Sequence, residues 1–177
     1  MFLKDSMAHL NVEFKARVND LSTTEKKLQE LTPFYKGEDN QVDTYFNVPR
    51  GRLKLREGNI ENALIYYERE NTAGKKQSNI LLYQHEPNQT LKEILVTTHG
   101  VKIVVNKKRR IYFIDNVKFH FDSVEALGNF IEVEAIDETG DIGLERLTSQ
   151  CEQFASFFQI QTRDYIALSY SDLLLER

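Results

Sequence analysis

The sequence predicts an α+β fold in which a closed antiparallel β-barrel carries helices on its outside. Three observations indicate it: about seven or eight segments alternate between polar and apolar residues, short turns join most of them, and their charged side chains are sorted by strand. Short turns imply antiparallel neighbours, and a run of strands flanked by helices is typical of the α+β class. Residues 1–177 are expected to form a single domain.

The strands are predicted from strict alternation, which places successive side chains on opposite faces. In the first, Glu13, Lys15 and Arg17 share one face and Val12, Phe14 and Ala16 the other. In chain order, strands are expected at residues 11–18, 42–48, 52–56, 63–70, 76–85, 101–114, 117–122 and 129–136.

Four helices are expected, at residues 22–31, 88–99, 142–158 and 163–175. Residues 22–25 read Ser-Thr-Thr-Glu, the form of a capping box, and Gly100 is a C-terminal cap for the second helix. The final helix is apolar enough to pack on its own barrel or on a second copy, so a homodimer is a candidate assembly.

Charge is segregated along these strands. Cations dominate the middle strands, whereas carboxylates gather on the first and last. A sheet face in water is the ordinary explanation of charge, but such a face usually intersperses signs because like charges directly opposite repel. If the sheet closes, the charged faces line its interior. Many buried cations would then require a bound polyanion.

The residue types point to a chemistry. Lys and Arg bind phosphate oxygens through charge-assisted hydrogen bonds, and carboxylates are suitable ligands for Mg²⁺ or Mn²⁺. Together they would form a phosphoryl-transfer site. The alternative without an anion is a plain β-sheet interaction protein whose charged faces lie in solvent.

The combined motifs resemble the CYTH superfamily of triphosphate tunnel metalloenzymes, and within it the class IV adenylyl cyclase-like branch. The resemblance runs from about Asn11 to Leu174. It rests on Asn11-Val12-Glu13-Phe14-Lys15 in the place of the family's E-x-E-x-K strand, on Asp43-Thr44-Tyr45-Phe46, Gly51-Arg52-Leu53-Lys54-Leu55-Arg56, Lys107-x-Arg109, His120-Phe121-Asp122 and Glu132-x-Glu134, and on the closing residues 169–174.

This resemblance implies an eight-stranded antiparallel tunnel that holds a triphosphate-containing small molecule. The residues it implies for the triphosphate are Lys15, Lys54, Arg56, Arg69, Lys76, Lys107 and Arg109. Those it implies for one or two divalent ions, Mg²⁺ or Mn²⁺, are Glu13, Asp122, Glu132 and Glu134. Glu13, Lys15 and Asp122 are the candidate catalytic residues, and His120 is expected to be structural or to support a ligand from behind.

Three activities are compatible with such a tunnel. One is conversion of ATP to cyclic AMP and pyrophosphate, as in class IV adenylyl cyclases. Another is hydrolysis of inorganic, thiamine or nucleoside triphosphate. The third is binding of polyphosphate or nucleotide without catalysis, which Asn11 favours because a neutral amide oxygen is a weaker metal ligand than the family's first Glu.

Composition excludes several other classes. The net charge of −4 gives no general basic field for nucleic acid, and alternation splits the basic run at residues 107–110 between two faces. Cys151 is the sole cysteine, so no intrachain disulfide can form, and it is expected in the core beside Phe154 and Phe158. No apolar run approaches a membrane span, and no signal peptide is evident. A cytoplasmic location is therefore expected.

Overall fold

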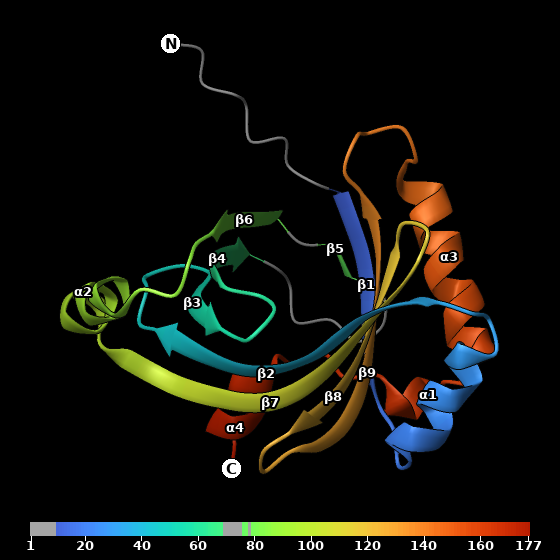
Figure 1. The fold of residues 1–177 in the computed structure, drawn as a ribbon, viewed down its shortest axis with the longest axis horizontal. Coiled ribbons are helices and arrows are strands. Elements are labelled where there is room, and N and C mark those ends of the chain that lie inside the picture. Colours follow the sequence, from blue (N-terminus) through green and yellow to red (C-terminus); the bar gives the residue numbers. More distant parts are fainter. Residues whose placement is uncertain (1–9, 69–75, 78) are drawn as a thin grey trace.

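The computed structural model describes residues 10–68, 76–77 and 79–177. They form a curled antiparallel sheet with helices on its flanks (Figure 1). The strands are β1 (Leu10–Arg17), β2 (Phe34–Phe46), β3 (Arg52–Glu57), β4 (Ala63–Glu68), β5 (Lys76–Gln77), β6 (Asn79–Gln84), β7 (Val101–Ile114), β8 (Val117–Val124) and β9 (Gly128–Asp137). The helices are α1 (Leu21–Gln29), α2 (Gln89–His99), α3 (Leu144–Phe157) and α4 (Tyr170–Leu175), with a 3₁₀ turn at Thr162–Asp164.

The expected barrel is present as a curled sheet that is not closed. Its strand order is β5-β1-β9-β8-β7-β2-β3-β4-β6, and no ladder joins β5 to β6 in the part of the chain that is described. These two strands are separated by Ser78 alone, so the nine strands differ from the expected eight only there. Closure would depend on one short segment serving both edges, and β5 contributes only two residue pairs to β1.

The two longest strands, β2 and β7, are antiparallel neighbours and carry the irregularities that curl the sheet. Their register shifts between Tyr35 and Gly37 and again between Tyr45 and Phe46, and such irregularities bend and twist a strand. Gly37 has φ of +139°, and a side chain there would collide with Ile60. β2 begins eight residues before the expected residue 42, because its first half carries polar side chains toward the interior and so shows no apolar alternation.

The convex side of β1, β8 and β9 is covered by α1 and α3 (Figure 1). Alternation along β1 sends Val12, Phe14 and Ala16 into this core, where Cys151 is also buried as expected. The opposite residues of the same strands therefore face the concave side. The hydrophobic core thus orients the charged face inward.

Two helix predictions were wrong in detail. α1 is capped by Asp20, whose Oδ1 accepts from the Thr23 amide at 3.1 Å, rather than by Ser22. The last helix is shorter than residues 163–175, because Tyr165 bridges to β1 and the Ile166 amide donates to the Lys15 carbonyl at 2.9 Å. Those contacts hold residues before α4 extended. None of the helices described is both long and apolar enough to cross a membrane.

Candidate functional site

The concave side of the sheet encloses a cavity of about 2070 Å³. Side chains from β1, β2, β3, β4, β6, β7, β8 and β9 line it, with Tyr170 of α4. The predicted site residues that it brings together are Glu13, Lys15, Lys54, Arg56, Lys107, Arg109, Glu132 and Glu134. Arg69 lies outside the described residues, and Lys76 is described only by its backbone in β5.

The predicted cations are buried, so the interpretation of a solvent-exposed sheet face was wrong. The side chain of Lys107 is 1% exposed and that of Arg109 is 5% exposed. Charges with so little contact with water need compensation nearby. The structure supplies that compensation from carboxylates of the same chain.

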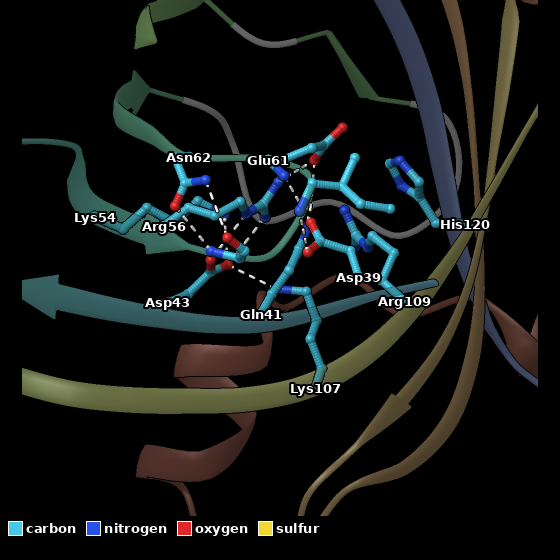
Figure 2. A network of polar contacts seen from close by, with 12 residues as sticks. Asp39, Gln41, Asp43, Lys54, Arg56, Glu61, Asn62, Lys107, Arg109 and His120 are labelled. Atoms are coloured by element: carbon cyan, nitrogen blue, oxygen red, sulfur yellow. Dashed lines mark hydrogen bonds and ion pairs between the residues drawn. The ribbon is translucent and has the colours of Figure 1, made fainter. Parts of the chain in front are cut away.

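Asp43 of β2 is the centre of the first charge cluster (Figure 2). Arg56 donates to it through Nε at 2.9 Å and Nη2 at 3.0 Å. Lys107 Nζ lies 2.7 Å from Asp43 Oδ2, and Lys54 Nζ lies 3.1 Å from the same oxygen. Strand register explains the meeting, because Asp43 is directly opposite Arg56 in the β2–β3 ladder. We call Asp43, Lys54, Arg56 and Lys107 the Asp43 cluster.

This crowding shifts the ionisation of the cluster. Although burial opposes it, Arg56, Lys107 and Lys54 together hold the pKa of Asp43 well below its usual range. Burial, reinforced by Arg56, Arg109 and Lys54, lowers the pKa of Lys107 to about 7 despite the attraction of Asp43. At pH 7 Lys107 is therefore about half protonated, whereas Asp43 remains charged.

A turn between β3 and β4 adds a second carboxylate to this side. The buried Asp39 accepts from the amides of Ile60 and Glu61 at 2.9 and 3.0 Å, and Gly58 lies so close to Asp39 that a side chain would collide with it. The turn delivers Glu61 to Arg56 Nη1 at 3.1 Å and to Lys118 Nζ at 2.7 Å. Although burial opposes it, Lys118 and Arg56 hold the pKa of Glu61 well below its usual value.

Arg109 is held by two carboxylates. Its Nε and Nη2 donate to Asp122 at 2.7 and 2.6 Å, and Nη2 also donates to Glu132 at 3.0 Å. The Tyr170 hydroxyl donates to Asp122 at 2.7 Å, while Lys15 Nζ lies 4.1 Å from the centre of the Tyr170 ring. Asp122 is fully buried and, in these contacts, orients Arg109. Its assignment as a metal ligand and catalytic residue remains a prediction.

The remaining carboxylates lie on β1 and β9. Glu13 is directly opposite Glu134, and Lys15 is opposite Glu132. Burial, with the negative charges of Glu13 and Glu132, raises the pKa of Glu134 to about 7. Asn11 Nδ2 donates to Glu134 at 2.5 Å. We call Asn11, Glu13, Glu132 and Glu134 the carboxylate cluster.

The carboxylate cluster fits a hard divalent ion in its donor chemistry. Carboxylate and amide oxygens are the ligands that Mg²⁺ and Mn²⁺ take, and crowded carboxylates are relieved by a cation. The buried Asn11 Oδ1 has no hydrogen-bond partner, so it is an oxygen that a ligand could use. Within the described part of the chain, no three His, Cys, Asp or Glu side chains are already arranged to hold a metal. Binding an ion therefore requires these side chains to move.

His120 of β8 faces the same cavity and lies directly opposite Glu132 in the β8–β9 ladder. Its ring is directed into the interior near Arg109 and Glu61 (Figure 2). Burial, together with Arg109 and Lys118, lowers the pKa of His120 to about 3, so the ring is neutral at pH 7. Its Nδ1 is 3.7 Å from Glu132 Oε2, which is longer than a hydrogen bond.

Sequence reasoning missed how the interior balances its own charge. It inferred that buried cations must require a polyanion, but carboxylates of the chain already pair with them. The missed residues are Asp39, Asp43, Glu61, Lys118 and Tyr170. Asp43 lies on the same face of its strand as Tyr45, so strand alternation could have indicated that it points inward. Glu61 lies in a turn, where no periodic pattern indicates the direction of a side chain.

Comparison with known proteins identifies the class. The CYTH domain family model matches residues 9–170. The chain therefore belongs to the CYTH domain family. No match was found among the curated proteins.

Several solved structures share the fold. The PH1012 protein of Pyrococcus horikoshii OT3 is 24% identical, with 92% of this chain and 98% of that chain covered and a TM-score of 0.79. A proposed adenylate cyclase of Vibrio parahaemolyticus is 20% identical, covers 96% and 99%, and has a TM-score of 0.77. HpAC1 of Hippeastrum, a proposed adenylyl cyclase with a dominant triphosphatase activity, is 16% identical, covers 93% and 94%, and has a TM-score of 0.63.

Proposed function

We propose that this protein binds a triphosphate in its concave cavity and, with a divalent ion, hydrolyses it. The observation that carries the proposal is the group of inward cations on β3 and β7, in a cavity whose other side holds the carboxylates of Glu13, Glu132 and Glu134. Such a division suits a polyphosphate at one end and its metal at the other. Membership of the CYTH family and the triphosphatase activity named for HpAC1 are consistent with it.

The Asp43 cluster would act as a preorganised phosphate site. Lys54, Arg56 and Lys107 are already held in place by a buried carboxylate. A triphosphate oxygen would take some of their hydrogen bonds without requiring the side chains to be ordered anew. Asp43 sets the strength of this site, because its negative charge competes with the substrate for the same donors.

Arg109 would contact the substrate from β7, with its orientation maintained by Asp122. Lys15 lies across the cavity on β1 and would contribute a further positive charge. Glu13, Glu132, Glu134 and Asn11 Oδ1 would hold the divalent ion. The ion would supply neutralisation of phosphate charge and a lower pKa for an attacking water.

Cyclisation of a nucleotide is a second candidate, and one feature favours it. The cavity wall formed by β4 and β6 is apolar, with Ala63, Ile65, Tyr67 and Ile80 in one cluster. An apolar wall beside a phosphate site suits a heterocyclic base. Cyclase activity would make cyclic nucleotide and pyrophosphate rather than orthophosphate.

The test is turnover of ATP, GTP, thiamine triphosphate and inorganic triphosphate with Mg²⁺ or Mn²⁺. Orthophosphate release would support hydrolysis, and pyrophosphate with cyclic nucleotide would support the second candidate. Substrate stabilisation of the protein without turnover would indicate a binding protein. If no triphosphate reacts or raises the melting temperature, the proposal is wrong.

A matched pair of variants tests the location. Lys107 faces the cavity, whereas the neighbouring Lys108 is exposed on the other face of β7. Lys107→Met should weaken triphosphate binding by about tenfold or more, since a hydrogen bond to a charged group contributes about 1.5–3 kcal/mol. Lys108→Met should change it less than about twofold because a surface charge is screened. Equal effects would place the site elsewhere.

A further inference from the structure

His120 is a buried side chain that lines the cavity. Its side chain is 4% exposed, and neither ring nitrogen has a hydrogen-bond partner among the described residues. Buried polar atoms are almost always satisfied, and each exception calls for an explanation such as an ion or ligand. A neutral imidazole offers one donor and one lone pair, so this ring leaves both capacities unused.

The position of the ring limits what could satisfy it. His120, Glu132 and Lys15 form one row across β8, β9 and β1, and the neighbouring row contains Lys118, Glu134 and Glu13. The imidazole therefore lies beside the carboxylate cluster. The unpartnered Asn11 Oδ1 lies at the other side of that cluster, on β1. Two buried groups with unpartnered lone-pair atoms thus lie on either side of the carboxylates of Glu13, Glu132 and Glu134.

We propose that His120 supplies a nitrogen ligand to the divalent ion held by the carboxylate cluster, and that the site consequently prefers a transition ion to Mg²⁺. This inference rests on the proposed metal-dependent function. Mg²⁺ strongly favours oxygen ligands, whereas imidazole nitrogen is a good ligand for first-row transition ions. Glu132 would bind the ion beside His120 and would also orient Arg109. It lies 3.7 Å from the His120 Nδ1 and accepts a hydrogen bond from Arg109.

The ligand set requires one local change. Glu132 must share its oxygens between Arg109 and the ion, and Glu134 must turn from the Asn11 amide nitrogen. Arg109 retains Asp122 when Glu132 moves, so that guanidinium is not left unpaired.

Mn²⁺ is the probe because it is paramagnetic and reports directly on its ligands. The wild-type protein with inorganic triphosphate and Mn²⁺ should show a directly coordinated ¹⁴N of imidazole type in pulsed electron paramagnetic resonance. Uniform ¹⁵N labelling of the protein should change that signal to the ¹⁵N pattern. His120→Phe should abolish it, while His99→Phe, a substitution on α2, should leave it unchanged.

Affinity gives a second readout. His120→Phe should weaken Mn²⁺ binding by about tenfold or more, since loss of even an outer-shell partner of a metal ligand costs about 10- to 100-fold in affinity. It should change Mg²⁺ binding less than about twofold. Bound Mn²⁺ without coordinated nitrogen would overturn the inference and leave the proposed function intact. Absence of any bound Mn²⁺ in the presence of triphosphate would overturn both. If His120→Phe does not fold, the nitrogen signal of the wild-type protein decides alone.

Discussion

The two sides of the cavity differ in how their buried polar groups are paired. In the Asp43 cluster, three cations share one buried carboxylate at distances of 2.7–3.1 Å. In the carboxylate cluster, Glu13 and Glu134 stand directly opposite each other, and Asn11 Oδ1 and both nitrogens of the nearby His120 have no hydrogen-bond partner. On the first side each cation contacts Asp43 directly, whereas on the second side a buried amide oxygen and a buried imidazole lie beside the carboxylates without a hydrogen-bond partner. A ligand would therefore displace contacts on one side and supply them on the other.

The largest expected effect is the loss of the carboxylate that completes the first side. Asp43→Asn removes the negative charge shared by three buried cations, so the free energy of unfolding should fall by about 3–5 kcal/mol. Urea denaturation measures this change. Inorganic triphosphate should raise the melting temperature of the variant more than that of the wild type, because it replaces the missing anion.

The control for this substitution is Asp20→Asn at the N-cap of α1, where Asn caps a helix as well as Asp does. Its stability should change by less than about 1 kcal/mol. If Asp43→Asn were as stable as this control, the cations would be compensated in some other way and the comparison of the two sides would fail.

Much of this arrangement could be predicted from sequence, because alternation along a strand shows which side chains share a face of the sheet. The inward positions of Lys54, Arg56, Lys107 and Arg109 were confirmed by their burial and contacts. Asp43, by contrast, was identified only as part of a motif. Its role depends on the register of β2 with β3, which brings it opposite Arg56. Alternation within one strand does not determine the register between two strands.

Other features depend on tertiary contacts and were less accessible. The early half of β2 looks like a loop because Asp39 and Gln41 point into a polar interior rather than an apolar core. Glu61 reaches the site through a turn held by Asp39. The final helix is short because β1 captures the backbone at Tyr165 and Ile166. In each case a long-range contact overrides the local pattern.

The next prediction concerns how Arg109 is held. Arg109→Lys keeps the positive charge but loses the forked donation to Asp122 and Glu132. Triphosphate affinity should fall by about 10- to 100-fold, the equivalent of one or two charged hydrogen bonds. The adjacent Arg110 pairs with Glu25 at 2.8 Å, away from the cavity. Calorimetric titration should show that Arg110→Lys binds triphosphate as the wild type does.

A smaller effect is expected when the carboxylate cluster receives another charge. Asn11→Glu places a carboxylate beside Glu134 and should raise the affinity for Mg²⁺ by about tenfold, since one added charge near the ion contributes on the order of 1–4 kcal/mol. Without an ion, the melting temperature should fall because like charges are crowded. Asn40→Glu on the exposed part of β2 should change neither property. Unaltered Mg²⁺ affinity in Asn11→Glu would place the ion away from β1.

The smallest expected effect is a pH dependence from the Asp43 cluster. Lys107 has a pKa of about 7 because burial and the positive charges of Arg56, Arg109 and Lys54 outweigh the attraction of Asp43. A triphosphate favours the protonated ammonium, so binding should take up a proton and weaken as pH rises. If binding requires that proton, affinity should fall by about fivefold between pH 7 and pH 8.

Lys107→Arg isolates this contribution, because a guanidinium stays charged throughout that range. The ionisation of the triphosphate itself and of Glu134 affects both proteins, so the informative quantity is the difference between their pH profiles. Calorimetric titrations in two buffers of different ionisation enthalpy measure the proton uptake directly. Identical uptake in wild type and variant would mean that Lys107 is fully charged before binding. Asp43 would then outweigh the burial of Lys107, and the Asp43 cluster would bind triphosphate with no proton exchange of its own.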